Sequence, residues 1–180
     1  MHVGNHNKLR TYVLMKEKGI DFKMEIYMKY VNDVVKRKVI SRFRMGVLSL
    51  RVETGRYEAN GVPNKRGIPV EFRVCECCDR MKVEDEIHFF IECPQYESER
   101  NIFLSVCKKE LKQFHFLIND GSLKVFDGIN EIGPEEVFSI IMRCTSKEVI
   151  CATASFVYYA YKKRTAFLHE IKCKRTSVFT

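Results

Sequence analysis

Several features are missing from this 180-residue chain, and each absence excludes a class of protein. Tryptophan is absent, but 13 Phe, 8 Tyr and a hydrophobic content of 46% are typical of a folded domain and exclude a disordered chain. No run of about 18 apolar residues occurs, so the sequence predicts no membrane span. The N-terminus also lacks the unbroken apolar stretch of a signal peptide. We therefore expect an intracellular protein.

Catalytic motifs are missing as well. The chain contains no glycine-rich phosphate-binding loop and no recognisable Ser/His/Asp pattern. Cys77 is the one obvious candidate for a nucleophile, and no motif links it to His115 or His169. The sequence therefore predicts a protein that is not an enzyme.

Positive charge is concentrated in the first part of the chain. The formal net charge is +8; residues 1–74 hold 16 Lys and Arg against 7 Asp and Glu, whereas residues 75–180 hold 15 against 16. A basic segment of this kind favours a polyanionic partner, most simply RNA or DNA. A basic face that is merely solvated explains the charge equally well, so charge alone does not decide between the two.

Four of the eight cysteines crowd into one short segment, where their spacing indicates a metal site. Cys75 and Cys78 form a Cys-x2-Cys pair, and His88 and Cys93 follow as a second pair. Zinc is commonly held by four such sulfur and nitrogen ligands in a tetrahedron, and four protein ligands leave no position for a catalytic water. The pattern therefore predicts a structural Zn²⁺ site, with a helical turn over Glu84–Glu92 that carries the second pair.

Other interpretations of these residues stay open. A lone Cys-x2-Cys pair is often ordinary packing, and Cys77 could replace either neighbouring ligand only with a tighter turn, so we treat it as a bystander. The acidic residues Asp79 and Glu84–Glu86 could cap a helix or bond to groups around the metal, although such runs are more often solvated. The remaining cysteines are predicted to be small buried hydrophobic side chains: Cys107, Cys144, Cys151 and Cys173.

Apolar spacing predicts a mainly α-helical fold. In the N-terminal third, Leu9, Tyr12 and Val13 share one helical face, a second helix follows Asp21 as its cap, and a third begins near Asn32 or Asp33. A short strand is expected at Val70–Val74. Further helices are expected over Tyr96–Leu111, around Leu123–Phe126, over Pro134–Cys144 and from a capping box at Thr145 and Glu148.

Four segments follow from this pattern, and we expect them to form one composite domain. They are a basic helical segment (1–57), a loop or linker with the short strand (58–74), the zinc-binding unit (75–96) and a C-terminal helical segment (97–180). The predicted fold class is a small, mainly α domain with one Cys3His zinc knuckle and a short β element beside it.

Two strings around the cysteines, Arg73–Arg80 and Val83–Pro94, resemble the zinc-binding region near the C-terminus of non-LTR (LINE-type) retrotransposon reverse transcriptases. Lys8–Tyr12, Ser41–Gly46 and Val52–Arg56 are similar to the stretch before the cysteines in animal elements, and Phe156–Arg164 is similar to their terminal helix. The matching positions of the zinc region are Cys75, Cys78, Glu84, Asp85, His88, Phe89, Cys93, Pro94 and Tyr96.

The resemblance implies a detached C-terminal part of such a protein, either an element remnant or a host gene derived from one. In these enzymes the polymerase lies upstream, with an aspartate-rich motif that this chain lacks, so an upstream polymerase domain is an expected partner. Some related elements carry a restriction-like endonuclease after the cysteines, and no corresponding acidic series follows here.

The leading hypothesis is therefore a zinc-stabilised module that binds RNA or DNA mainly through the phosphate backbone. Tyr57, Phe72 and Phe89 could stack on exposed bases, although each ring is more readily explained as core. The cluster Lys36–Lys38, together with the resemblance, suggests a nuclear location. The predicted phosphate contacts are Lys36, Arg37, Lys38, Arg42, Arg44, Arg51 and Arg56.

The rival hypothesis is a structural or protein-interaction zinc domain without direct contact to nucleic acid. In that case zinc only holds a helical domain together, and the basic face meets an acidic protein or the polymerase.

Overall fold

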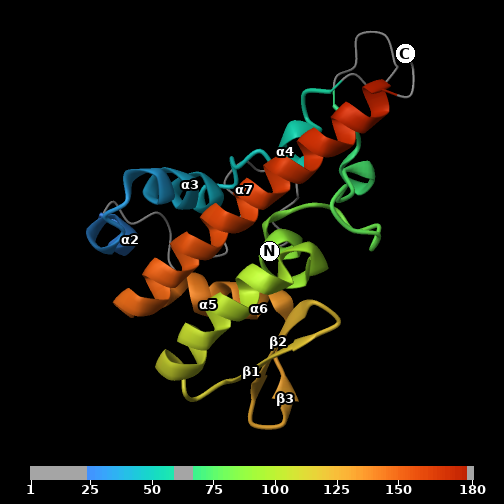
Figure 1. Cartoon of the computed structure of the whole chain (residues 1–180). Coiled ribbons are helices and arrows are strands. Elements are labelled where there is room, and N and C mark those ends of the chain that lie inside the picture. The colour runs from blue at the N-terminus through green and yellow to red at the C-terminus, as the bar shows by residue number, and fades with distance from the viewer. Residues whose placement is uncertain (1–23, 59–66, 178–180) are drawn as a thin grey trace.

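The computed structural model describes residues 24–58 and 67–177, and its backbone is mainly helical (Figure 1). The final helix α7, Lys147–Ser177, runs the length of the molecule, and α3, Val34–Arg44, and α5, Glu97–Glu110, pack against it. The shorter helices are α2, Ile26–Tyr30, α4, Arg51–Thr54, and α6, Pro134–Arg143. The predicted mainly α fold is confirmed. No helix in the described part of the chain is both long and apolar enough to cross a membrane.

Two helix starts follow the sequence prediction. The side chain of Asp33 accepts hydrogen bonds from the backbone N–H groups of Val35 (2.9 Å) and Lys36 (3.1 Å), and so caps α3. Pro134 occupies the first turn of α6, where its missing N–H costs no helical hydrogen bond. The helix predicted around Leu9 and the cap predicted at Asp21 lie outside the described residues.

The start of α7 differs by one residue from the prediction. The helix begins at Lys147, so Ser146 precedes it, and the Ser146 hydroxyl accepts the backbone N–H of Val149 at 3.4 Å. Thr145 stands one position too early to reach the first turn, and the capping box predicted from Thr145 and Glu148 does not form.

The segment predicted as a short helix around Leu123–Phe126 is a strand, and that prediction is wrong. Strands β1, His115–Asn119, and β2, Ser122–Asp127, pair antiparallel, and β3, Asn130–Glu131, extends the sheet beyond β2. The β1–β2 turn consists of Asp120 (φ 48°) and Gly121 (φ 68°), the two left-handed residues of a type I′ hairpin turn. This turn fixes a register in which Asn119 faces Ser122.

A second correction concerns Val70–Val74, which was expected to be a strand. Val70–Phe72 forms a single 3-10 turn, η1, and Val74 then makes one isolated antiparallel bridge to Val83. The short β element beside the cysteines is this bridge. Pro69 immediately before the turn has no N–H to donate, which disfavours a longer ladder here.

Aromatic rings from distant segments meet in one core. Phe90 packs edge-on against Phe103 of α5, Phe138 of α6 and Phe156 of α7, with ring centroids 5.4, 5.8 and 4.9 Å apart. Phe43 of α3 lies 5.9 Å from the same ring. All five rings are buried. Since Phe90 belongs to the cysteine-containing segment, that segment forms the centre of the core and is not an appendage to it.

The cysteines outside that segment are only partly as predicted. Cys107 is buried within α5, and Cys144 and Cys151 are half-buried. Cys173 is exposed near the end of α7, so its prediction as a buried side chain is wrong.

Substitutions at two glycines test how closely the β1–β2 turn packs against Pro94. A Cβ at Gly121 would lie 2.5 Å from Cβ of Pro94, whereas a Cβ at Gly128 would meet nothing within 4 Å; both glycines have positive φ. We expect Gly128→Ala to cost about 1–2 kcal/mol of unfolding free energy through its backbone alone, and Gly121→Ala to cost about 1–3 kcal/mol more. Urea unfolding of both variants checks this, and equal losses would contradict the proposed clash.

Candidate metal centre

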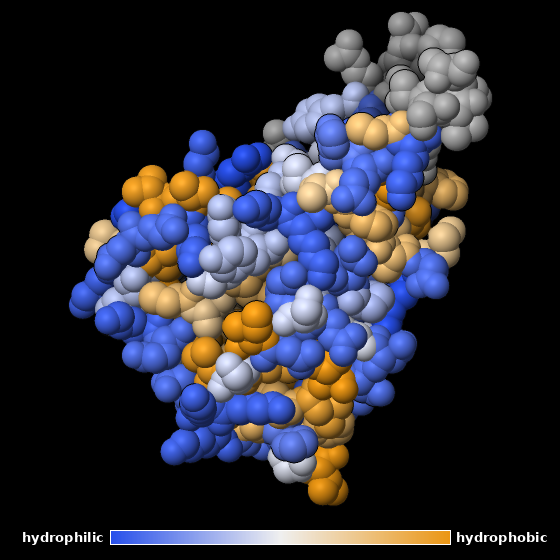
Figure 2. Space-filling model, viewed as in Figure 1, coloured by the Kyte–Doolittle hydropathy of each residue, from blue (hydrophilic) through white to orange (hydrophobic). Residues whose placement is uncertain are grey.

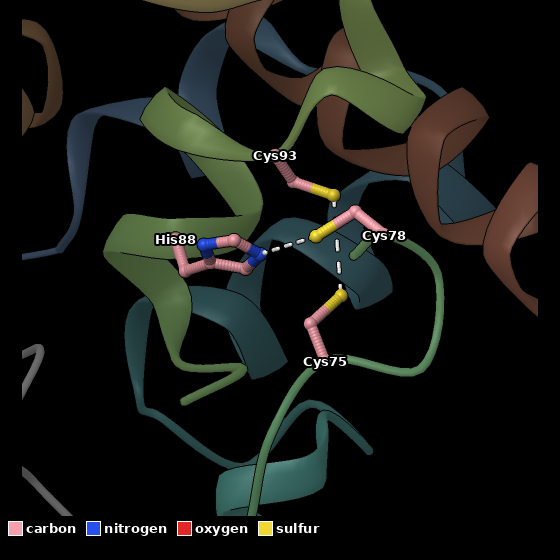
Figure 3. A group of neighbouring side chains, drawn as sticks. All are labelled: Cys75, Cys78, His88 and Cys93. Atoms are coloured by element: carbon pink, nitrogen blue, oxygen red, sulfur yellow. Dashed lines mark hydrogen bonds between the residues drawn. The ribbon is translucent and has the colours of Figure 1, made fainter. Parts of the chain in front are cut away.

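The four predicted ligands lie together in the structure (Figure 3). The sulfur atoms of Cys75, Cys78 and Cys93 and a ring nitrogen of His88 all lie within 4.8 Å of one another. Cys75 Sγ is 3.9 Å from Cys93 Sγ, and Cys78 Sγ is 3.4 Å from Nε2 of His88. Cys78 is half-buried and the other three are buried.

The first pair of ligands is held by a tight turn. Val74 and Val83 form the β bridge at its base, and Cys75 N–H donates to the carbonyl of Lys82 at 2.8 Å. Inside the turn, the backbone N–H of Cys77 points to the sulfur of Cys75 at 3.4 Å. Two thiols three residues apart are thereby directed to the same point, as a Cys-x2-Cys metal knuckle requires.

The second pair is carried by η2, His88–Glu92, one turn of π-helix. The Asp85 carboxylate accepts the backbone N–H of His88 at 2.8 Å and caps this turn, while Cys93 N–H donates to the carbonyl of His88 at 2.7 Å. The predicted helical turn is therefore present, but it is wound more widely than an α-helix. Such wide turns are frequent at functional sites, and here the i to i+5 bond places the ligand backbones next to each other.

These distances match a tetrahedral metal site. With metal–sulfur bonds of about 2.3 Å and metal–nitrogen bonds of about 2.0–2.1 Å, tetrahedral ligand atoms lie roughly 3.5–3.8 Å apart. The measured separations of 3.9 and 3.4 Å are close to that range. The Cys3His cluster can therefore hold a metal ion with little movement of the ligands.

The second ring nitrogen of His88 also has a partner. Nδ1 lies 3.4 Å from the Glu92 carboxylate, which accepts a second hydrogen bond from Nζ of Lys82 at 2.8 Å. The His88 hydrogen bond and Lys82 lower the pKa of Glu92 to about 2 against the effect of its burial. An ionised carboxylate behind a metal-binding histidine fixes the ring and the tautomer that directs Nε2 to the ion.

Metal-free, the site retains protons. Burial lowers the pKa of His88, but hydrogen bonds with Cys75 and Glu92 outweigh burial and raise that pKa to about 10. A hydrogen bond from Cys77 lowers the pKa of Cys75, whereas Cys93 and burial raise it, to about 11. Ligands bind a metal only when deprotonated, so binding at neutral pH must displace protons from this cluster.

Cys77, treated above as a bystander, is buried and lies beside the cluster. Its sulfur, that of Cys75 and a carboxylate oxygen of Glu84 also lie within 4.8 Å of one another. Hydrogen bonding to Cys75 and burial both raise the pKa of Cys77, so this thiol stays protonated. The Cys3His set has four donors and matches a tetrahedron, whereas this second set has three and shares Cys75 with it.

Glu84 has a role that the sequence prediction missed. It belongs to a run of acidic residues predicted to be mostly solvated, yet it is only 1% exposed. Its carboxylate accepts two hydrogen bonds from Arg164 of α7, at 2.6 and 2.5 Å, and one from the backbone N–H of Arg51 at 2.7 Å. Glu84 therefore ties α7 and α4 to the turn that carries Cys75. Glu86 is buried as well, and only Asp79 of the run is exposed.

Arg100 is a second residue that no sequence motif indicated. It is fully buried, and its guanidinium donates to the carbonyls of Phe90 (3.0 Å) and Cys93 (3.0 Å), and also to that of Gly121. Burial lowers the pKa of Arg100 to about 10, so it remains charged at neutral pH. This cation holds the end of η2 and the hairpin turn together immediately beside the ligand Cys93.

The seven predicted phosphate contacts fall into two groups. Arg44, Arg51 and Arg56 form ion pairs within the protein, with Glu25, with Glu58 and Glu76, and with Glu53. The other four lie on α3, and in the described part of the chain none of them pairs with a carboxylate; they are Lys36, Arg37, Lys38 and Arg42. Lys36 donates to the Ser155 hydroxyl and Arg37 to the carbonyl of Asn32. Arg42 donates to the carbonyl of Val47 and the hydroxyl of Ser49, and Lys38 is exposed.

The three aromatic rings predicted to stack on bases also differ in their exposure. Phe89 is fully buried against Tyr96, with ring centroids 4.8 Å apart, so it belongs to the core. Tyr57 and Phe72 are 63% and 66% exposed. Of the three rings predicted to stack on bases, only those of Tyr57 and Phe72 could therefore meet a base without unfolding.

Comparison with models of protein families, with curated proteins and with solved structures finds no match to this chain.

The Glu84–Arg164 pair predicts a strong and non-additive effect on stability. Arg164→Met leaves a buried carboxylate without its cation, and we expect a loss of about 3–5 kcal/mol in unfolding free energy. Adding Glu84→Gln removes the stranded charge, so the double variant should be more stable than Arg164→Met alone. Chemical denaturation of the metal-loaded protein measures both. Losses that simply add would show that the two side chains do not act as a pair.

Proposed function

We propose that the ion held by Cys75, Cys78, His88 and Cys93 is zinc, and that its role is structural. Three thiolates and one imidazole in a tetrahedron are a ligand set typical of Zn²⁺. Four protein ligands fill the coordination shell, which leaves no position for substrate or an activated water. The observation that carries this proposal is the convergence of all four donor atoms within 4.8 Å.

Native mass spectrometry of the purified, reduced chain should find one zinc ion per molecule. His88→Ala and Cys93→Ser each remove one ligand, so both should lose the ion or bind it more weakly. Cys173→Ser removes an exposed thiol far from the cluster and serves as the matched control, which should retain full occupancy. A folded parent that binds no zinc at any added concentration, or that retains it in both ligand variants, would refute the assignment.

For the protein as a whole we propose a zinc-stabilised nucleic-acid-binding module, related to the C-terminal part of a non-LTR retrotransposon reverse transcriptase. Helix α3 supports this proposal because it has five basic residues and no acidic one. Four basic side chains, Lys36, Arg37, Lys38 and Arg42, make hydrogen bonds to neutral groups or remain exposed. A row of cations without carboxylate partners favours phosphate binding. A nuclear location would accord with this function and stays a prediction.

Arg44, at the end of α3, and Arg51 and Arg56 beyond it are less suited to this role than the α3 group, by which we mean Lys36, Arg37, Lys38 and Arg42. Each would have to give up an internal carboxylate before it could bind a phosphate, and Arg44 also donates to the carbonyl of Met142 at 2.8 Å. The proposal therefore assigns backbone contacts to the α3 group alone. An upstream polymerase domain remains a proposed partner.

Salt-dependent binding of a fluorescent oligonucleotide tests this assignment. Replacing Arg37, Lys38 and Arg42 together by Gln removes up to three phosphate contacts, so the slope of log Kd against log salt should fall by about 2–3. The matched control replaces the exposed Lys108, Lys109 and Lys112 by Gln, which removes the same charge from another surface. The control slope should stay within about one unit of the parent.

The rival function is a zinc domain that contacts only protein. Exposed Val34 and Val35 in the first turn of α3 favour it, since apolar side chains among cations also suit an acidic protein surface. Equal slopes for the two triple variants, or no binding of nucleic acid by the zinc-loaded parent, would decide in favour of this rival.

A further inference from the structure

An apolar groove of about 490 Å³ lies between α5 and α7, and none of the four cluster residues lines it. Ile102 and Val106 of α5 form one wall, Tyr159 of α7 forms the other, and Phe103 and Phe156 form the floor. Figure 2 shows hydrophobic surface between these two helices, surrounded by hydrophilic residues. The volume lies within the range of roughly 300–1,000 Å³ that is common for small-molecule sites, so a planar group of nucleobase size has room to enter.

The two walls are unusually open to solvent for apolar side chains. Ile102 is 73% exposed and Tyr159 is 50% exposed, although both belong to long, well-packed helices. Phe103 and Phe156 form the floor below them and are almost completely buried. An aromatic floor with a half-exposed tyrosine ring at its rim is a surface on which a flat, aromatic ligand can stack.

Cations stand on both sides of this groove. Nζ of Lys36, from α3, donates to the Ser155 hydroxyl at 3.1 Å and lies 5.2 Å from the centre of the Tyr159 ring. On the other side, Nζ of Lys163 lies 3.1 Å from the carboxylate of Glu99. The groove therefore combines an apolar centre with two ammonium groups and with polar oxygens from Ser155 and Glu99 at its rim.

We propose that this groove binds one unstacked base of a single-stranded nucleic acid. The base would stack on Tyr159, and an adjoining phosphate would contact Lys36, whose side chain donates to the neutral Ser155 hydroxyl. The bases of a duplex are stacked within the helix and cannot enter, so the groove selects single strands. The proposal rests on the proposed nucleic-acid-binding function and names the form of its ligand.

Lys36 connects this groove to the basic face of α3. It is one of the four α3 cations described above, and it contacts Ser155 and Tyr159 of α7 directly. A single strand whose backbone follows α3 would therefore reach the groove without leaving the positive surface. This continuity favours a polyanion carrying aromatic bases over a protein helix as the occupant.

The test compares two labelled oligomers of about 12 nucleotides, one of thymidine and one abasic, which carry the same backbone charge. The zinc-loaded full chain should bind the thymidine oligomer about fivefold to a hundredfold more tightly, the range expected for one stacked base. Tyr159→Ala should lose most of that preference and leave the affinity for the abasic oligomer unchanged. Tyr57→Ala, which removes another exposed ring outside the groove, should retain the preference.

The outcomes separate this inference from the function on which it rests. A parent that binds neither oligomer removes the proposed function and the inference together. A parent that binds both oligomers equally, or a preference that is lost with Tyr57→Ala but not with Tyr159→Ala, leaves backbone binding in place and overturns the base-binding groove. Light scattering on the parent and on Ile102→Glu completes the test: a dimer that this substitution dissociates would show that a second copy occupies the groove.

Discussion

The buried Cys3His cluster is the constraint on which the rest of this fold depends, because its ligands also determine where the core begins. His88 is followed directly by Phe89 and Phe90, and the turn that directs His88 to the cluster directs these two rings into the core. Phe90 then contacts rings from α3, α5, α6 and α7. Closing the metal site therefore orients the residue around which the four helices pack, and folding of the core should be coupled to metal binding.

Burying so many charges in one place requires that they balance. A divalent ion with three thiolates and a neutral imidazole retains one negative charge, and Arg100 supplies a buried cation next to Cys93. Glu92 is balanced by Lys82, and Glu84 by Arg164. Each of these three anionic groups thus lies next to a cation, and the three cations come from the turn that carries Cys75 and Cys78, from α5 and from α7. The charges hold the surrounding elements in place at the same time as they make a buried metal site energetically possible.

The sequence identified the four residues that come together in the cluster but not the groups around them, and the reason is physical. Ligand spacing is local, since 19 residues contain the whole Cys3His pattern, and helices such as α3 carry their own periodicity and cap. Arg100 binds backbone carbonyls, which have no sequence signature, and Glu84 meets a partner 80 positions away. The hairpin is different, because Asp120-Gly121 is a recognised signal for a type I′ turn. The spacing of the short apolar run after it, Leu123–Phe126, is compatible with either a helix or a strand. Only the turn before this run distinguishes the strand from the helix.

Helix α7 connects the buried Cys3His cluster to the proposed binding surfaces, which the cluster itself does not touch. Ser155 contacts Lys36 on the basic face, and Arg164 binds Glu84 beside the cluster. Nine residues of α-helix separate these contacts by about 13 Å, and a packed helix transmits position over that distance because it bends little. If the Cys75 turn opened, Glu84 would lose its place, Arg164 would lose its buried partner, and the register of α7 against α3 and α5 would no longer be fixed. The basic face and the apolar groove both lie along that helix, so the Cys3His cluster and these two surfaces share one packed element.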